Sequence, residues 1–578
     1  MGGTGVNADH FERRDDRPGG GRRNGHGRSG SGRDDHGGRR RPGGQDDRRD
    51  ARGRQRPAAR VRGERSTSRQ APGQRAKRTD PARTAAFDVL REVDESDAYA
   101  NLVLPPLLAD RRIRGRDAGF ATELTYGTLR MRGRYDAVLA ECVDRPLDDL
   151  DAGVLDVLRL GAHQLLGMRV PSHAAVSETV ALARTNVGAG PAQFVNAVLR
   201  RVSEVSLPEW LERIEAGAPD RLTGLATVQS HPLWVVRSLR EALAGHGRDP
   251  GEIGDLLAAD NEPPRVTLVA RPGLVDVSDD DAWHDADLVP GRWAPTALVL
   301  DGSDPGVVPA VRDGRAGVQD EGSQLVTLAL AAVPLDGRGA GGPARNEAPQ
   351  ARATDSGGPV SEPEPSTSGP ERWLDLCAGP GGKAALLAAL AAQRGATLVA
   401  NEVQPHRARL VRRALDAVPD GVVEEVRTGD GRETGTDEPG AYDRVLVDAP
   451  CTGLGALRRR PESRWRRTPA DLATLTGLQR ELLASALDAV RPGGVVAYVT
   501  CSPVLAETQL VVTDVLRRRD DVERLDTPAV VRSVLRTEPD GTRPDLPLTG
   551  GAGARDDVQL WPHVHGTDAM HLTLLRKH

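Results

Sequence analysis

Cysteine is scarce in this chain, which has only four in 578 residues: Cys142, Cys377, Cys451 and Cys501. None is spaced as Cys-x-x-Cys, which argues against a zinc knuckle or a disulfide framework. Free thiols are typical of a reducing cytosol. The 13 histidines show no ligand spacing with these thiols, so we expect no bound metal.

Long apolar runs and aromatic residues are also lacking. No stretch of about 18 apolar residues occurs, and the Gly/Arg-rich N-terminal region lacks the apolar core of a signal peptide. We therefore expect a soluble, cytoplasmic protein that does not contact a membrane. With only 7 Trp, 5 Tyr and 4 Phe, broad aromatic platforms for stacking bases are not expected.

The distribution of charge hides an asymmetry within the net value of −5. Residues 1–80 contain 22 Lys and Arg against 11 Asp and Glu, a net charge of +11, so the remainder carries −16. This low-complexity segment cannot bury enough apolar surface to offset its chain entropy, and we expect it to be a disordered tail. The tail either contacts a polyanion or is simply solvated.

The rest of the chain divides by its hydrophobic patterns into four regions. We expect an all-helical domain over 81–225, a linking α+β subdomain over 226–335, a flexible Gly/Pro/Ser-rich insertion over 336–371 and an α/β domain over 372–578. The predicted helices cover 81–93, 117–143, 155–168, 174–186, 192–205 and 317–333, and the first strands lie within 263–273 and 297–306. Ser172 is a candidate cap of the helix that begins near residue 174.

After residue 371 apolar runs alternate with helical stretches, which is typical of an open, mostly parallel sheet that binds ligands beyond the carboxyl ends of its strands. The first strand ends in a glycine-rich loop, residues 375–383, which allows a ligand to approach the backbone closely. The next two strands end at Glu402 and Asp430. Acidic residues suit ribose hydroxyls and base amino groups but would repel a pyrophosphate, which favours S-adenosylmethionine over NAD.

The fourth and fifth strands end in Asp448-Ala449-Pro450-Cys451 and in Thr500-Cys501-Ser502. A single cysteine at a strand end is usually a small buried residue. If the two strands are neighbours, however, two thiols and one carboxylate converge beside the nucleoside pocket.

Four segments in this order resemble the RNA (cytosine-5)-methyltransferases, and more narrowly the Sun/Fmu/RsmB group that acts on 16S ribosomal RNA: DLCAGPGGK, DAPCTG, RRRPESRW and TCS. In the helical region, ELTYGTLR and NAVLRR resemble the NusB antitermination factor, and VQDEGSQL resembles the segment before the catalytic fold. The resemblance implies a NusB-like domain followed by a Rossmann-like class I methyltransferase domain. The chain departs from the family at Thr452, usually Ser, and at residues 568–571, where the family has Asp-Gly and two aromatic residues.

The resemblance also implies roles for individual residues. Cys501 would add as a thiolate to carbon 6 of cytosine, Asp448 would hydrogen-bond the ring nitrogen, and Cys451 would assist product release. Lys383 would polarise groups near the base, with a surface lysine as the alternative, and Cys142 is expected to be inert. The expected cofactor-binding set is Cys377, Ala378, Gly379, Pro380, Gly381, Gly382, Lys383, Glu402, Asp430 and Asp448; Cys377 is expected to pack rather than react.

Arginines crowd around Trp465 just after the fourth-strand motif. We interpret them as a phosphate-contacting lid beside the active site, with a solvated charged helix as the alternative. They are Arg458, Arg459, Arg460, Arg464, Arg466 and Arg467.

Several alternatives stay open at this point. A DNA cytosine-5 methyltransferase would use the Pro-Cys thiol with a Glu-Asn-Val partner, which this sequence lacks. A non-catalytic NusB-like RNA-binding assembly factor and a transfer RNA methyltransferase are two others. We expect a monomer that acts on 16S ribosomal RNA, either naked or in an early assembly intermediate.

Overall fold

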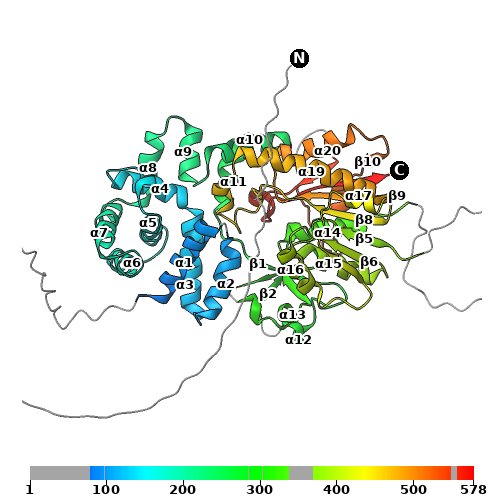
Figure 1. Ribbon diagram of the computed structural model, residues 1–578, viewed down its shortest axis with the longest axis horizontal. Coiled ribbons are helices and arrows are strands. Elements are labelled where there is room, and N and C mark those ends of the chain that lie inside the picture. The colour runs from blue at the N-terminus through cyan, green and yellow to red at the C-terminus, as the bar shows by residue number, and fades with distance from the viewer. Residues whose placement is uncertain (1–78, 97, 284–285, 302–303, 337–368, 549–555) are drawn as a thin grey trace, which may run out of the picture. The chain divides into compact units, whose positions relative to one another are not determined.

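The computed structural model describes residues 79–96, 98–283, 286–301, 304–336, 369–548 and 556–578, which all belong to one unit that begins at Ala76 (Figure 1). Nearly all of the predicted tail (1–80) and insertion (336–371) lie outside these residues. In the part of the chain that the structure describes, no helix combines the length and the apolar composition needed to span a bilayer.

The N-terminal part of this unit is helical. Its helices are α1 (Pro81–Ser96), α2 (Ala100–Asp110), α3 (Gly115–Arg130), α4 (Arg132–Cys142), α5 (Ala152–Leu166), α6 (Ser172–Asn186), α7 (Ala189–Ser203) and α8 (Leu207–Gly217). Apolar residues at helical spacing, such as Leu90, Leu139, Leu158 and Leu199, meet in one core. The all-helical prediction is confirmed.

Two details of the predicted helices are wrong. The segment 117–143 is not one helix, because α3 ends at Arg130 and α4 begins at Arg132 after a break at Met131. Ser172 does not cap α6: it is the first helical residue, and the preceding Pro171 stands at the cap position without a side-chain bond.

A linking region follows, with α9 (Arg221–Val228), α10 (Leu233–Gly245) and α11 (Ile253–Asp260) before a small antiparallel sheet in the order β2-β3-β1-β4. Its strands are β1 (Val266–Ala270), β2 (Leu288–Pro290), β3 (Ala297–Leu300) and β4 (Ala316–Val318), with short helices α12 (Asp280–Trp283) and α13 (Pro309–Arg312) between them. The predicted helix 317–333 begins later, as α14 (Glu321–Ala332), because residues 316–318 form β4.

The C-terminal part is built on an eight-stranded sheet with the order β10-β12-β9-β8-β5-β6-β7, and β11 pairs with β12. Strands β5 (Arg372–Asp375), β6 (Thr397–Asn401), β7 (Val423–Arg427), β8 (Tyr442–Asp448) and β9 (Val490–Thr500) are parallel. Strand β12 (His571–Lys577) runs antiparallel between β9 and β10 (Val522–Arg524), and it also pairs with β11 (Asp557–Gln559).

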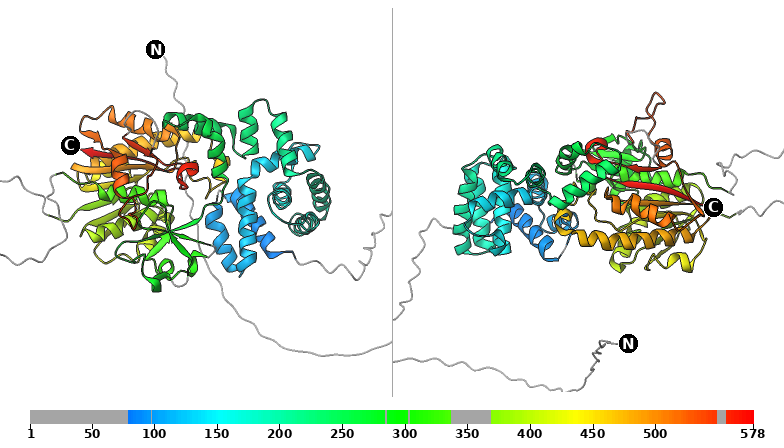
Figure 2. Two further views of the ribbon diagram at one scale, coloured as in Figure 1. Left: turned by 180° about the vertical axis from the view of Figure 1, so that it is seen from behind. Right: turned by 90° about the horizontal axis from the view of Figure 1, so that it is seen from above.

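Helices cover both faces of this sheet (Figure 2). Helices α14, α15 (Gly382–Gln393), α16 (Pro405–Leu415) and α21 (Thr527–Ser533) lie on one face, and α17 (Thr434–Asp437), α19 (Pro469–Ala489) and α20 (Gln509–Leu516) on the other. The short helices α18 (Ser463–Arg466) and α22 (Pro562–His565) lie in the connections.

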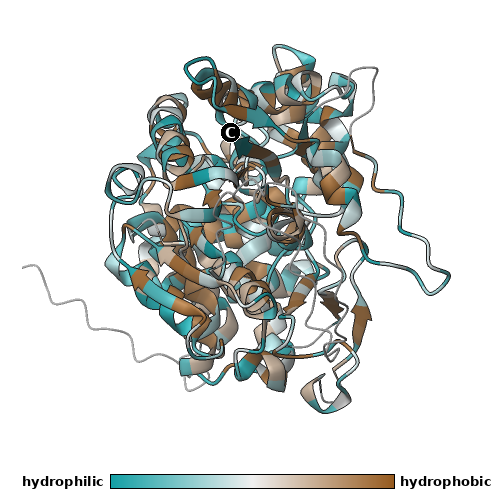
Figure 3. Cartoon of the chain, turned by 90° about the vertical axis from the view of Figure 1, so that its right-hand side faces the viewer, coloured by the Kyte–Doolittle hydropathy of each residue, from teal (hydrophilic) through white to brown (hydrophobic). Residues whose placement is uncertain are grey.

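Successive side chains of a strand point to opposite faces of the sheet, which explains why a layer of helices packs on each face. In β9, Val495 and Ala497 belong to the core on one face, whereas Val496 and Tyr498 belong to the core on the other. Residues 495–499 of β9 are therefore apolar on both sides of the sheet, and brown segments mark such apolar stretches in Figure 3. Other strands carry charges, such as Glu424 and Glu425 in β7.

Candidate active site

Cys451 and Cys501 form the centre of the site. Strands β8 and β9 are parallel neighbours, so the loops that follow them leave the sheet at the same edge. The sequence analysis expected the two thiols to converge if their strands are neighbours. The strands are neighbours, and the two Sγ atoms lie 3.4 Å apart.

The two thiols differ in acidity although both are partly buried. The hydrogen bond with Cys451 lowers the pKa of Cys501 and outweighs the opposite effect of burial. The same bond, together with burial, raises the pKa of Cys451 well above its ordinary value. Cys501 is therefore the more acidic thiol of the pair.

Lys383 and Asp448 lie beside the thiols. Lys383 Nζ is 2.8 Å from Asp448 Oδ2, and its side chain is largely buried, so the alternative of a surface lysine is wrong. Burial would lower the pKa of Lys383, but the charge and hydrogen bond of Asp448 offset it and leave the pKa raised. Lys383 also lowers the pKa of Cys501, whereas Asp448 raises it.

The turn that carries Cys451 is fixed by a residue that the sequence analysis missed. Glu507 is completely buried and accepts hydrogen bonds from Thr452 N (2.7 Å), Thr452 Oγ1 (2.5 Å) and Gln479 Nε2 (3.2 Å). The hydroxyl of Thr452, at a family position that is usually Ser, is thus in use. The only signal in the sequence was an acid six residues beyond Cys501.

The glycine-rich loop between β5 and α15 lies next to Glu402. Glu402 Oε2 accepts a hydrogen bond from Gly379 N (3.0 Å), and a Cβ atom at Gly379 would lie 2.1 Å from that oxygen. Gly381 has φ +114° at the start of α15, where a Cβ atom would collide with Ala414. No atom lies within 4 Å of a Cβ position at Gly382, so the loop is open there.

Asp375, at the end of β5, is a second residue that the sequence analysis did not single out for a role. It is completely buried, and neither carboxyl oxygen has a hydrogen-bond partner within the described residues. Burial first, and the charge of Asp448 second, raise its pKa to about 8. A buried carboxyl whose oxygens have no partner among the described residues, next to the glycine-rich loop, suits a ligand that brings hydrogen-bond donors, such as the amino group of S-adenosylmethionine.

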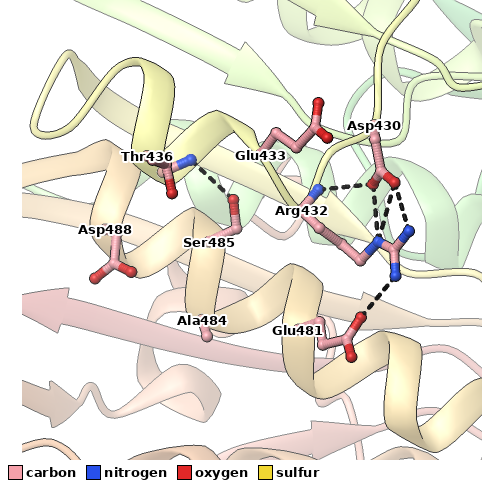
Figure 4. A pocket seen from close by; sticks show the side chains of 9 residues that line it. Asp430, Arg432, Glu433, Thr436, Glu481, Ala484, Ser485 and Asp488 are labelled. Atoms are coloured by element: carbon pink, nitrogen blue, oxygen red, sulfur yellow. Dashed lines mark hydrogen bonds and ion pairs between the residues drawn. The ribbon is translucent and has the colours of Figure 1, made fainter.

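Asp430 lies at the rim of a cavity of about 410 Å³ (Figure 4). Its carboxylate pairs with the guanidinium of Arg432 at 2.6 Å, and Arg432 also reaches Glu481 at 3.0 Å. The hydrogen bond from Arg432 lowers the pKa of Asp430. The cavity is lined by Asp430, Arg432, Glu433, Gly435, Thr436, Glu481, Ala484, Ser485 and Asp488.

The other two cysteines are placed as expected for packing residues. Cys142 is buried in the helical core, and burial raises its pKa. Cys377 packs against the core of the sheet, and burial, followed by the charge of Asp375, raises its pKa well above the ordinary value.

The interpretation of the arginine-rich segment as a phosphate-contacting lid is wrong for most of its members. Arg458 and Arg459 pair with Asp320 and Asp568, so both guanidiniums are held by carboxylates of the same chain. Arg464 is completely buried, and its guanidinium donates to Asn261 Oδ1 (2.8 Å) and to the Ser230 carbonyl (3.1 Å).

The segment instead docks against the helical domain. Arg466 donates to the carbonyls of Val93 (2.7 Å) and Ala98 (2.5 Å), and Glu462 Oε1 accepts from Ala100 N (3.0 Å). The indole of Trp465 occupies the space over Gly133, where a Cβ atom would lie 2.4 Å from the ring. Charge alone suggested phosphate binding, but these arginines bind backbone carbonyls and carboxylates of the same chain.

One group of possible metal ligands occurs among the described residues. His246, Asp557 and His571 are buried with their ligand atoms within 4.8 Å of one another. The amide nitrogen of Gln509 lies 3.0 Å from His246 Nδ1 and 3.2 Å from Asp557 Oδ2, so a polar network already joins two of them. The expectation of no bound metal stays a prediction.

Comparisons with known proteins decide the family. A family model described as 16S rRNA methyltransferase RsmB/F matches residues 365–576, and a NusB family model matches residues 80–204. The chain is 48% identical to the putative methyltransferase Rv1407 of Mycobacterium tuberculosis strain H37Rv, over 87% of this chain and 98% of that protein. The chain belongs to the RsmB/F family of rRNA methyltransferases.

Two further comparisons agree with this membership. A probable ribosomal RNA small subunit methyltransferase B of Bacillus subtilis strain 168 is 29% identical over 86% of this chain and 98% of that protein. The crystal structure of PH0851 covers 86% of this chain with a TM-score of 0.65 and 20% identity, which supports the fold. The NusB-like helical domain and the α/β methyltransferase domain predicted from the sequence are thus confirmed, as is the assignment to this family of enzymes.

Proposed function

We propose that this RsmB/F-family enzyme methylates carbon 5 of a specific cytosine in 16S ribosomal RNA through a covalent adduct with Cys501. The observation that carries the proposal is the pair of thiols 3.4 Å apart, in which the hydrogen bond makes Cys501 the more acidic. Carbon 5 of cytosine is a poor nucleophile until a group adds to carbon 6. A thiolate is a soft nucleophile and a good leaving group, which suits both the addition and the later release.

The residues around the thiols suit the remaining proton transfers. After Cys501 adds to carbon 6, the ring nitrogen gains electron density and needs a hydrogen-bond donor. Asp448 is ion-paired with Lys383 at 2.8 Å, so this pair can place a shared proton at that nitrogen. Release requires transfer of the carbon 5 proton to a base, which solvent water can be, and cleavage of the bond between carbon 6 and the Cys501 sulfur, which takes back the electron pair. We assign assistance in that cleavage to Cys451, because its sulfur lies 3.4 Å from that of Cys501 and can hydrogen-bond the departing thiolate.

S-adenosylmethionine would supply the methyl group as an electrophilic sulfonium methyl. We infer that the loop 377–383 holds it together with Glu402, Asp430 and Asp448. The open space at Gly382 and the unmatched acceptors of Asp375 support this assignment.

The experiment that tests the proposal separates the two thiols by the species that each variant leaves behind. Full-length Cys501→Ala and Cys451→Ala variants are incubated with a 16S ribosomal RNA transcript and S-adenosylmethionine, then resolved by denaturing electrophoresis. Cys501→Ala should give neither methylation nor adduct. Cys451→Ala should accumulate a protein–RNA complex, because addition occurs while release is impaired.

The matched control is Cys142→Ala, which removes a buried thiol of the helical domain and should methylate without accumulating adduct. Adduct in Cys501→Ala would reverse the two roles, and full activity in both variants would show that the thiols only pack. A transfer RNA transcript in parallel reactions tests the substrate: methylation of transfer RNA but not of 16S RNA would refute the ribosomal assignment.

A further inference from the structure

Three buried side chains from distant parts of the chain meet beside the end of β9. His246 follows α10, Asp557 begins β11, and His571 begins β12, where it pairs with Thr500 of β9. The three are 0%, 6% and 0% exposed in that order. Asp557 Oδ2 lies 3.7 Å from His246 Nδ1 and 3.8 Å from His571 Nδ1. Two imidazole nitrogens and a carboxylate oxygen therefore face the same point.

The opposite nitrogen of each imidazole ring faces a hydrogen-bond acceptor. His246 Nε2 is 3.1 Å from the Pro503 carbonyl, which can only accept, so Nε2 carries the proton and Nδ1 of the neutral ring presents a lone pair. His571 Nε2 is 3.1 Å from the hydroxyl oxygen of Thr573, which can accept in the same way. Histidines that bind metal ions typically donate their second ring N–H to such an oxygen, which fixes the ring and directs the other nitrogen at the ion.

The side-chain amide of Gln509 provides a fourth position. Its nitrogen lies 3.0 Å from His246 Nδ1 and 3.2 Å from Asp557 Oδ2. A half-turn of the amide exchanges its nitrogen and oxygen, which are nearly equal in size, and so presents an oxygen at this place. Tetrahedral zinc with nitrogen and oxygen ligands separates its ligand atoms by about 3.3–3.6 Å. The separations of 3.0, 3.2, 3.7 and 3.8 Å lie close to that range.

We propose that His246, Asp557 and His571 bind one Zn²⁺ ion in a structural site, which the amide oxygen of Gln509 completes. Two imidazoles with a carboxylate suit zinc, whereas Mg²⁺ and Ca²⁺ prefer oxygen ligands alone. The ion would tie the end of α10 to β11 and β12. Through the contact of His246 with Pro503 it would also hold the chain two residues beyond Cys501.

The sequence does not reveal these ligands as a set. His571 stands where the second aromatic residue of the family motif is expected, and the other two ligands lie at positions 246 and 557. The expectation of no bound metal rested on the spacing of histidines relative to the cysteines, and none of these ligands is a thiol. The proposal therefore departs from that expectation. The ion takes no part in the proposed methyl transfer, so the site is tested separately from the adduct experiment.

The test measures zinc binding by the full chain. Protein stripped of metal with dipicolinate is dialysed against buffers of increasing free Zn²⁺ concentration, and bound zinc is measured by inductively coupled plasma mass spectrometry. Wild type should bind about one ion per chain at the tightest site. His571→Phe, which installs an aromatic residue as in the family motif, should weaken this binding more than about 100-fold. Thr573→Val removes only the acceptor of His571 Nε2 and should weaken it about 10- to 100-fold.

Two controls separate this site from other zinc ligands of the chain. His406→Ala removes an exposed histidine of α16, and Cys451→Ala/Cys501→Ala removes the two thiols; both should keep the tight site. Circular dichroism checks that each variant is folded. Absence of a tight site in wild type, its loss from the thiol variant, or its persistence in folded His571→Phe would overturn the proposal.

Co²⁺ in place of Zn²⁺ gives a readout that needs no variant. Tetrahedral cobalt with nitrogen and oxygen ligands should show visible d–d absorption without charge transfer from a thiolate. Thiolate charge transfer at the first equivalent of Co²⁺ would place the ion on the cysteines and refute the site.

Discussion

The buried guanidinium of Arg464 gives a quantitative test of the docking between the segment after Cys451 and the rest of the chain. Its side chain is completely buried. It donates to Asn261 Oδ1 at 2.8 Å, to the Ser230 carbonyl at 3.1 Å and to the Asp260 carbonyl at 3.3 Å. We predict that Arg464→Ala destabilises the protein strongly.

The expected size follows from these contacts. Hydrogen bonds from a charged donor contribute about 1.5 kcal/mol or more each, so three amount to about 4–5 kcal/mol, and burial of the charge offsets part of this. Arg464 also opposes the effect of burial on Asp260, whose pKa is raised to about 7 mainly because it is buried. Removing the cation leaves that carboxyl without compensation, and we expect the free energy of unfolding to fall by about 3–5 kcal/mol.

Urea unfolding of the full chain, followed by circular dichroism at 222 nm, measures this change. Arg464→Lys keeps the charge but not the planar fork, and should lose about 1–3 kcal/mol. The control is Arg467→Ala, a half-buried arginine of the same segment, which should change the unfolding free energy by less than about 1 kcal/mol. A loss below about 1 kcal/mol in Arg464→Ala would refute the reasoning, because the contacts of Arg464 would then contribute nothing beyond the cost of its burial.

Two further predictions concern Asp375 and Gly133. The folded state raises the pKa of the Asp375 carboxyl from 3.8 to about 8 and so favours its protonated form. The stability that this preference contributes is fully present below about pH 4 and is lost as the pH rises through 8. Asp375→Asn should therefore gain stability relative to wild type between pH 5 and pH 8, measured by urea unfolding; a difference independent of pH would contradict the raised pKa. Gly133→Ala should cost about 1–3 kcal/mol, because the new Cβ atom would lie 2.4 Å from the Trp465 ring. Gly190→Ala in α7, where no atom lies within 4 Å, should be neutral or slightly stabilising by the same measurement.

The sequence was informative where chemistry follows from topology. Parallel strands end at one edge of a sheet, so the residues closing each apolar run can be grouped from the order of the strands along the chain. The prediction that the thiols of Cys451 and Cys501 lie close together also required their two strands to be neighbours. Strands β8 and β9 are neighbours in the sheet. The sequence does not decide whether Lys383 lies at the active site or on the surface, because the residues around a lysine at a helix start do not reveal its partner. Its burial depends on Asp448, 65 positions away in the chain.

The sequence was misleading where the partner of a charge lies in another part of the chain. The arginines after Cys451 have the composition of a phosphate-binding segment, yet Arg464 binds residues more than 200 positions earlier. Hydrophobic periodicity does not reveal such contacts, because backbone carbonyls are present at every position. Helix α2 was missed for a different reason: it contains Pro105 and Pro106, which in a sequence indicate a helix end.

The contacts of the loop after Cys451 help to hold the two thiols at the separation that the proposed reaction requires. The turn at Cys451 is tied at its start, where Glu507 binds both the amide and the hydroxyl of Thr452. It is tied again where Arg459 binds carboxylates of the linking region and of the C-terminal segment, and at its end by Arg464. A loop held at three points loses little further entropy when substrate binds, so the cost of aligning the thiols is met largely by folding rather than by binding RNA. The same segment also binds the helical domain, because Glu462 accepts from Ala100 N and Arg466 donates to the Val93 carbonyl, so that domain adds a further point at which the loop after Cys451 is held.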